Sequence, residues 1–326
     1  MATPRLPRSR VLGRCLAAVA VIIAVWVTTL GASRVDLYAR PGALPAISVS
    51  TLAARYKANR RAVGQALRTA RRIQDGDRAR SLSRLLTPGR QFLSFDPRGT
   101  GQAVEVVGDL AHARRVAIFV PGADTTLSTF DTRGDRPYST PGGGARALLT
   151  EATALDPHPG LAVVAWLGYS PPKVTSAGVM TDVRADAGAP RLRRLVRALH
   201  RLNPRAGTTL LCHSYGSVVC GEALRGLPVT DVAAFGSPGM RAATVAALGT
   251  RANVWAARGS GDWMQFVPHV HVLGLGFGTD PVSPGFGARV FAAGSGGHSD
   301  YLRPGSPSLR NLALIALGRG PQVTLA

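Results

Sequence analysis

The chain has 326 residues and a net charge of +21, and 45% of its residues are hydrophobic while 17% are charged. This balance supports the buried core of one large or two smaller domains and excludes a wholly disordered chain. Three cysteines are too few for a disulfide framework, and the sequence shows no zinc-ligand spacing, helix-turn-helix or RNA-binding aromatic motif, so we predict no metal, no cofactor and no nucleic-acid partner.

The first 33 residues have the pattern of a targeting segment. Four arginines between residues 5 and 14 precede an apolar run, CLAAVAVIIAVWVTTL, at residues 15–30. Positive charge before an apolar stretch is typical of export, and the charged flank stays in the cytoplasm. The run is longer than many signal-peptide cores and shorter than the roughly 20 residues of a spanning helix. We expect residues 1–33 to be a single-pass anchor in the cell membrane, with residues 11–32 in the bilayer, or a cleaved signal of a secreted protein. Either way the catalytic part lies outside.

Residues 34–90 are predicted to be a linker followed by a basic helical segment. In residues 51–86 apolar side chains recur at spacings near three and four, which indicates one or two helices broken near residues 75–77. The opposite face is rich in arginine. It is either an ordinary solvated face or a basic surface held near anionic membrane lipids. The arginines of this face are Arg55, Arg60, Arg61, Arg68, Arg71 and Arg72.

From residue 91 onward, short apolar runs alternate with helical patterns. QFLSF and AVEVV, separated by a turn sequence, predict a hairpin. VAIFV, LAVVAW, TLLC, DVAAF and NVWAA follow, with helices expected near 144–155, 190–202, 215–226 and 241–248. Unbroken runs of Val, Leu and Ala that alternate with helices indicate parallel strands covered on both faces. The fold class predicted for residues 91–326 is therefore α/β, with a mostly parallel central sheet and an antiparallel opening pair.

A candidate nucleophile lies in the segment LCHSYGS at residues 211–217. The segment joins a buried strand to an apolar helix, the place where the pattern G-x-S-x-G forms a nucleophile elbow. Such an elbow is a sharp turn that thrusts the Ser214 hydroxyl out of the sheet. Gly216 satisfies the need for a small residue, and Cys212 stands where the first Gly is usual. The alternative is an ordinary serine at a strand–helix junction.

The two cysteines near this serine are expected to be buried free thiols. Cys212 lies at a strand end, and Cys220 lies well into the following helix. A disulfide is permitted outside the cytoplasm, but these positions do not suggest a pair.

Two downstream loops supply an acid and a base. In α/β hydrolases the chain order is Ser, then acid, then His. Asp262 follows NVWAARG, and His298 follows VFAAG, so each lies in a loop after an apolar run. We predict that His298 accepts the Ser214 proton and that Asp262 holds the imidazole tautomer and stabilises the imidazolium. The rivals are Asp280 for the acid, and His269 and His271 for the base.

Two backbone N–H groups are expected to form an oxyanion hole. One belongs to Tyr215, directly after the nucleophile, and the other to Ala123 or Asp124 in the loop VPGADTT that follows VAIFV. The loops 168–180 and 262–297 are expected to cover the site and bind an acyl group. Their apolar residues include Trp263, Met264, Phe266, Val267, Leu273, Leu275 and Phe277.

Over about residues 90–317 the chain resembles a bacterial α/β-hydrolase family catalogued as a domain of unknown function. The resemblance implies a serine-hydrolase fold with a triad on Ser214, Asp262 and His298, and it supplies no substrate. The Cys at position 212 departs from the family's usual Gly. The segments that carry the resemblance are FDPRGTGQAVEVVGD, VAIFVPGADTTL, VVAWLGYSPP, LLCHSYGS, FGSPG and GHSDYL followed by GSPSLRNLA.

Together these features predict a serine hydrolase that cleaves a carboxylic ester, with a lipid-like ester as the narrower expectation, through an acyl-enzyme intermediate. Two alternatives stay open: an amidase or peptidase of the same fold, and a non-catalytic α/β-hydrolase-like protein of the envelope. The expected partners are the ester substrate and the membrane, the latter through residues 11–32 and the basic segment 51–86.

Overall fold

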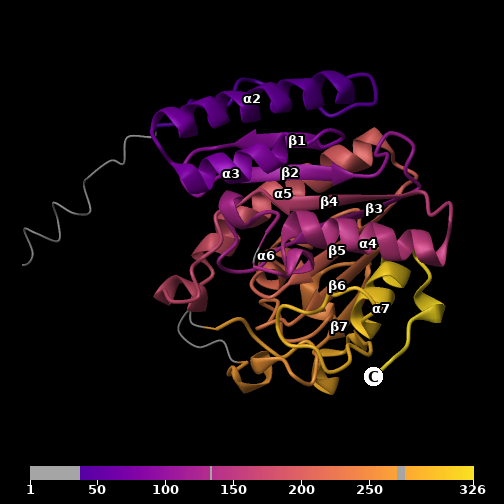
Figure 1. Cartoon of the computed structure of the whole chain (residues 1–326). Helices are drawn as coiled ribbons and strands as arrows, with labels where there is room; N and C mark the ends of the chain where they lie inside the picture. Colours follow the sequence, from indigo (N-terminus) through magenta and orange to yellow (C-terminus); the bar gives the residue numbers. More distant parts are fainter. Residues whose placement is uncertain (1–36, 133, 270–275) are drawn as a thin grey trace, which may run out of the picture. The chain divides into compact units, whose positions relative to one another are not determined.

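An eight-stranded sheet in the order β1-β2-β4-β3-β5-β6-β7-β8 forms the centre of the structure (Figure 1). The structure is a computed structural model that describes residues 37–132, 134–269 and 276–326. The strands are β1 (Gln91–Asp96), β2 (Gln102–Val107), β3 (Arg115–Val120), β4 (Leu161–Leu167), β5 (Gly207–His213), β6 (Asp231–Phe235), β7 (Asn253–Ala257) and β8 (Arg289–Val290).

The sheet is mixed, as the sequence predicted. Strand β2 pairs antiparallel with both β1 and β4, whereas all pairings from β4 to β8 are parallel. All seven residues of β4 are buried, which explains why its sequence is an uninterrupted apolar run without alternation. The parallel arrangement brings the carboxyl ends of β3, β5, β6 and β7 to one edge, where the candidate site lies.

Helices cover both faces of the sheet and create two apolar cores. One core includes side chains of α2 (Leu52–Arg72), α3 (Gly76–Leu85), α4 (Pro141–Leu155) and α7 (Pro307–Ala316). The other includes side chains of α5 (Val183–Leu202) and α6 (Gly216–Ala223). These two layers around a parallel sheet are the architecture that the alternation of strands and helices predicted.

Two predicted helices differ from those observed. The helix expected near 190–202 begins earlier, at Val183, and contains the exposed Pro190, so it continues through a position where proline cannot donate the usual bond to the carbonyl four residues before it. The prediction of a helix near 241–248 is wrong, because only a single 3-10 turn forms there, at Ala246–Leu248. The backbone there is bound elsewhere, because the N–H of Arg241 donates to the carbonyl of Phe277 and that of Val245 to Phe286.

The basic segment forms two helices, α2 and α3, as the break near residues 75–77 predicted. Tyr38–Ala326 is one compact unit, and Leu82 and Leu85 of α3 belong to the core beneath the sheet. The boundary placed at residue 90 therefore does not separate two compact units. The predicted anchor lies outside the described residues, and among the described helices none has the length and apolarity needed to cross a membrane.

The arginines of α2 fall into two groups. Arg55 donates from Nε to the carbonyl of Leu93 at 2.6 Å, and Arg60 donates from Nη2 to that of Leu86 at 2.7 Å, so both hold the helix to neighbouring segments. They do not belong to a freely solvated stripe. The remaining four are exposed, and no carboxylate in the described part of the chain pairs with them: Arg61, Arg68, Arg71 and Arg72.

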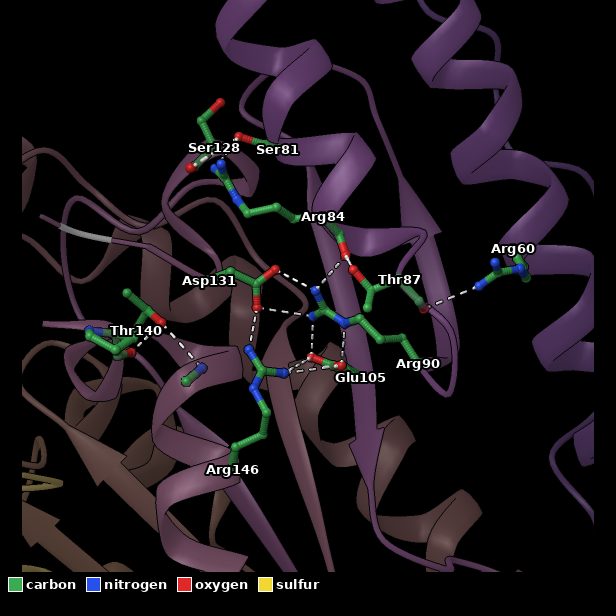
Figure 2. A network of polar contacts seen from close by, with 12 residues as sticks. Arg60, Ser81, Arg84, Thr87, Arg90, Glu105, Ser128, Asp131, Thr140 and Arg146 are labelled. Atoms are coloured by element: carbon green, nitrogen blue, oxygen red, sulfur yellow. Dashed lines mark hydrogen bonds and ion pairs between the residues drawn. The ribbon is translucent and has the colours of Figure 1, made fainter. Parts of the chain in front are cut away.

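A network of four charged side chains joins the end of the helical segment to the sheet (Figure 2). Arg90 donates from Nε and Nη2 to the two carboxylate oxygens of Glu105 on β2, both at 2.6 Å. Asp131 accepts from Arg90 at 3.0 Å and from Arg146 of α4 at 2.6 Å. The side chain of Glu105 is only 2% exposed. Two cations and two anions thus neutralise one another. Arg90 and both carboxylates are nearly buried, whereas Arg146 is partly exposed.

We predict that Glu105→Gln destabilises the protein by about 3 kcal/mol, because the guanidinium groups of Arg90 and Arg146 are then left with the single carboxylate of Asp131. Urea unfolding followed by circular dichroism measures the change. The control is Glu151→Gln on α4, a partly exposed residue without an ion pair in the described structure, for which we expect less than about 0.5 kcal/mol. Equal effects of the two substitutions would show that the network contributes little.

Candidate active site

Ser214 lies on a sharp turn between β5 and α6. Its φ is +54°, a left-handed backbone conformation that is costly for a residue with a side chain. The turn depends on glycine at position 216, since a Cβ there would lie 2.4 Å from the carbonyl oxygen of Val120 on β3. The N–H of Ser214 donates to the carbonyl of Phe235 at the end of β6. This strained strand-to-helix junction has the geometry of a nucleophile elbow.

A continuous hydrogen-bonded relay connects this serine to a buried carboxylate. The Oγ of Ser214 lies 2.9 Å from Nε2 of His298. The other ring nitrogen, Nδ1, lies 2.9 Å and 3.1 Å from the two oxygens of Asp262. Because a carboxylate only accepts, Nδ1 carries the proton, which leaves Nε2 as the acceptor for the serine hydroxyl. The structure thus brings together the three side chains that chain order selected.

The rival residues take part in other contacts. Asp280 forms an ion pair with Arg258 and lies 3.8 Å from His269, not beside His298. His269 donates from Nε2 to the carbonyl of Ser237 at 3.2 Å. His271 lies outside the described residues. Of the two candidate acids, only Asp262 is hydrogen-bonded to the imidazole that faces Ser214.

Three donors hold the Asp262 carboxylate in place. Besides His298, the N–H of Met264 donates to Oδ1 at 2.9 Å and the hydroxyl of Tyr301 donates to Oδ2 at 2.6 Å. Burial alone would raise the pKa of Asp262, but the hydrogen bonds and charge of His298 and the hydrogen bonds from Tyr301 and Met264 outweigh it and lower the pKa below its ordinary value. The carboxylate therefore remains ionised although its side chain has no exposed surface.

Two backbone N–H groups are candidates for the predicted oxyanion hole. Among the described residues, the N–H groups of Ala123 and Tyr215 have no hydrogen-bond acceptor. The N–H of Asp124 is already donated to the carbonyl of Pro172 at 2.9 Å, which corrects the expectation that Asp124 could be a donor. Its carboxylate accepts from the N–H of Val174, so Asp124 fixes the loop, and of the two residues expected to donate only Ala123 has an N–H without an acceptor among the described residues. Gly122 is required because a Cβ there would lie 2.6 Å from Cβ of Ser214.

An apolar cavity of about 550 Å³ opens above Ser214 and His298. The predicted loops supply its walls, although Phe266 is 79% exposed and does not line it. Leu273 and Leu275 lie outside the described residues. The hydroxyl of Tyr215 donates to the carbonyl of Thr181 and so ties one wall to the elbow. The apolar lining includes Val174, Val179, Met180, Trp263, Met264, Val267 and Phe277.

The cysteines are not free thiols: Cys212 and Cys220 form a disulfide, with their Cα atoms 6.4 Å apart. The expectation was wrong because it treated the strand end and the helix as pointing away from each other. The sharp turn at Ser214 folds α6 back against the end of β5, so a residue one turn into the helix faces the strand. The cross-link closes the loop that contains Ser214.

Three residues of this site have no signal in the sequence. Tyr301 supports Asp262, and Ser217 donates to the carbonyl of Ser214 at 2.7 Å. His213 donates from Nε2 to the carbonyl of His298 at 2.7 Å and lines the cavity. Tyr301 and His213 bind groups that are distant in sequence, so only the fold brings these partners within reach, whereas the bond of Ser217 is local to the turn.

A sequence model described as alpha/beta hydrolase matches residues 96–272, more than half of the chain. The uncharacterized protein Rv2079 of Mycobacterium tuberculosis is 32% identical over 266 residues, which cover 70% of this chain and 39% of the relative. The uncharacterized protein Rv0963c of the same species is 35% identical over 158 residues, or 47% of this chain and 58% of the relative. The chain therefore spans about two fifths to three fifths of these relatives' lengths.

Solved structures with a similar fold include two hydrolases. The esterase PE8 matches with a TM-score of 0.41 and 15% identity, over 64% of this chain and 95% of the esterase. The α/β serine hydrolase XC6422 of Xanthomonas campestris, described as having no lid, matches with a TM-score of 0.43 and 16% identity, over 71% of this chain and 95% of that protein.

We predict that Tyr301→Phe lowers the free energy of unfolding at pH 7 by about 1.5–3 kcal/mol, the usual value of a hydrogen bond to a charged group. The pKa of Asp262 is lower in the folded state, so its contribution to stability is present above the ordinary carboxyl pKa of about 4 and is lost as the pH falls through the depressed value. Without the hydroxyl this pKa rises. The difference between wild type and variant is therefore largest at neutral pH and shrinks as the pH falls below about 4.

Urea unfolding at several pH values between 7 and 2 measures this difference. The matched control is Tyr56→Phe, because the buried hydroxyl of Tyr56 has no hydrogen-bond partner and its loss breaks no bond to a carboxylate. A Tyr301→Phe effect that stayed constant over the whole pH range would mean that the hydroxyl acts through packing and not through Asp262.

Proposed function

Because the chain belongs to the alpha/beta hydrolase family, we propose that it is a serine hydrolase that cleaves a carboxylic ester. The observation that carries the proposal is the relay from Asp262 through His298 to Ser214, which ends beneath an apolar cavity and beside two unpartnered backbone N–H groups. A nucleophile, its base, an orienting acid and an oxyanion hole are the parts that acyl transfer requires.

In the proposed reaction, Oγ of Ser214 attacks the ester carbonyl while Nε2 of His298 takes its proton. Asp262 orients the imidazole and stabilises its positive charge. The N–H groups of Ala123 and Tyr215 stabilise the oxygen of the tetrahedral intermediate. Collapse of the intermediate breaks the ester bond, and the imidazolium gives its proton to the departing alcohol. Water then attacks the acyl-enzyme by the same route and releases the acid.

The cavity favours an acyl group as the part of the substrate that is recognised. Its volume of about 550 Å³ is typical of small-molecule sites. The walls contributed by residues 174–180 and 263–268 are mostly aliphatic or aromatic, which suits a hydrocarbon chain. No charged side chain other than Asp124 and the histidines lines the described cavity, so a lipid-like ester fits it better than a charged peptide.

We also propose that the catalytic part lies outside the cytoplasm. Two features support this location: the arginine-flanked apolar run at residues 15–30, and the disulfide between Cys212 and Cys220, a bond that persists in oxidising compartments. The four exposed arginines of α2 would then face the anionic lipids of the membrane surface. They are Arg61, Arg68, Arg71 and Arg72.

Replacement of the nucleophile tests the proposed reaction. We expect Ser214→Ala to lower the rate of hydrolysis of p-nitrophenyl esters by about 10⁶-fold, as loss of the nucleophile does in triad enzymes, and to abolish labelling by a fluorophosphonate probe. Ser83→Ala, at an exposed position of α3, is the control and should retain both. A wild-type rate that rises from acetyl to octanoyl esters supports the acyl site.

Three results would reject parts of this proposal. A Ser214→Ala protein with near-normal activity would exclude this serine as the nucleophile. A wild-type protein that neither reacts with the probe nor hydrolyses any ester would favour the non-catalytic alternative. Faster cleavage of the matched anilides than of the esters would favour an amidase.

Protease accessibility in spheroplasts tests the location. We expect added protease to digest the catalytic part of the full chain in intact spheroplasts, because it lies on the outer side of the membrane, while a cytoplasmic marker survives. Protection of both proteins until the spheroplasts are lysed would place the catalytic part inside the cell.

A further inference from the structure

A second groove, of about 740 Å³, lies between α5, strand β2 and the linker at residues 44–47. It shares no lining residue with the cavity above Ser214. Five arginines line it and no aspartate or glutamate does, a composition that favours a negatively charged ligand. The arginines are Arg55, Arg191, Arg194, Arg197 and Arg201.

Three of these guanidinium groups have no partner in the described part of the chain. Arg194, Arg197 and Arg201 are exposed, and no hydrogen bond or ion pair engages their side chains. The other two are partly engaged: Arg55 donates to the carbonyl of Leu93, and Arg191 donates to Gln102 and to the carbonyl of Gly168. The carboxylate of Asp96, whose pKa Arg191 helps to lower, is already bound by Arg98 at 2.6 Å.

The three free arginines form one row along α5. Residues three and four apart lie on the same helix face, so positions 194, 197 and 201 project side by side into the groove. Like charges at these spacings repel one another and weaken a helix. No carboxylate of the groove offsets that repulsion, but a bound anion would. Guanidinium groups are also well suited to phosphate, which they bind through two parallel hydrogen bonds.

Apolar side chains also line the same groove. They include the almost fully buried Val104 and Trp166 and the partly buried Ile47 and Leu195. A free phosphate would leave this surface uncovered, whereas a phosphate attached to a hydrocarbon chain would cover it. Trp166 is only 2% exposed, so the groove offers no aromatic face on which a nucleic-acid base could stack.

We propose that this groove binds the head group of an anionic phospholipid. The phosphate contacts Arg194, Arg197 and Arg201, while the glycerol and the first methylene groups lie over Ile47 and Leu195. The position in the chain agrees with this ligand. The apolar run ends at Leu30, and Leu44 in the wall of the groove follows it by about 14 residues. A fully extended chain of that length reaches no more than about 50 Å. An anchor at that run would keep the groove near a bilayer.

The test measures binding and does not depend on hydrolysis. The full chain carrying Ser214→Ala, in neutral detergent, is titrated in a calorimeter with dihexanoyl-phosphatidylglycerol. The same chain is titrated with dihexanoyl-phosphatidylcholine, with inorganic phosphate and with a single-stranded oligonucleotide. We expect phosphatidylglycerol to bind at least tenfold more tightly than each of the other three probes, with an affinity that falls as salt is added.

Charge-matched variants show where the lipid binds. Arg194→Gln/Arg197→Gln/Arg201→Gln should weaken phosphatidylglycerol binding at least tenfold. The control, Arg205→Gln/Arg251→Gln/Arg310→Gln, removes the same charge from exposed positions that do not line the groove. It should change the affinity for phosphatidylglycerol less than twofold. Circular dichroism checks that both variants are folded.

Several outcomes would overturn the proposal. Equal losses in the two variants would mean that net charge attracts the lipid without a site. Equal binding of the two lipids, unaffected by the groove variant, would place the ligand in the active-site cavity or the micelle. Phosphate that bound as tightly as the lipid would make the groove a site for free phosphate. Tighter binding of the oligonucleotide would make it a nucleic-acid site.

Discussion

The close approach of the turn at Ser214 to the end of β3 is the constraint on which the candidate site depends. A side chain at position 216 would collide with the Val120 carbonyl, and one at position 122 would collide with Ser214 itself. Only glycine permits this approach, which allows Ser214, Ala123 and Tyr215 to line the same cavity. The left-handed conformation of Ser214 costs free energy, which the backbone bond to Phe235 and the disulfide help to offset.

The same edge of the sheet also carries the buried carboxylate of Asp262, which is ionised. Asp262 is fully buried, a location that favours the neutral acid, and three donors from separate segments reverse that preference. Tyr301 also links two loops, because its hydroxyl accepts from the N–H of Gly259 while it donates to Asp262. The loop after β7 and the loop that carries His298 are thereby fixed to each other, and the imidazole between them has one orientation.

Arginine has three distinct roles in this chain. Arg90, which is nearly buried, and Arg146, which is partly exposed, pair with Glu105 and Asp131 and join the helical segment to the sheet. Arg55 and Arg60 bind carbonyl groups and hold α2 in place. Others remain exposed without a counter-charge, in a row on α2 and in the groove along α5. The net positive charge is therefore divided between arginines that bind groups within the protein and arginines that stay exposed.

Local sequence patterns predict the alternation of strands and helices, the mixed sheet and the chain order of Ser214, Asp262 and His298, because burial periodicity and a strand–turn–helix motif involve residues that are close in sequence. They do not predict the pairing of Cys212 with Cys220, the support from Tyr301 or the single 3-10 turn in place of a helix at 241–248. Each of these depends on contacts between segments that the sharp turns and the sheet bring together, and short-range patterns carry no information about such contacts.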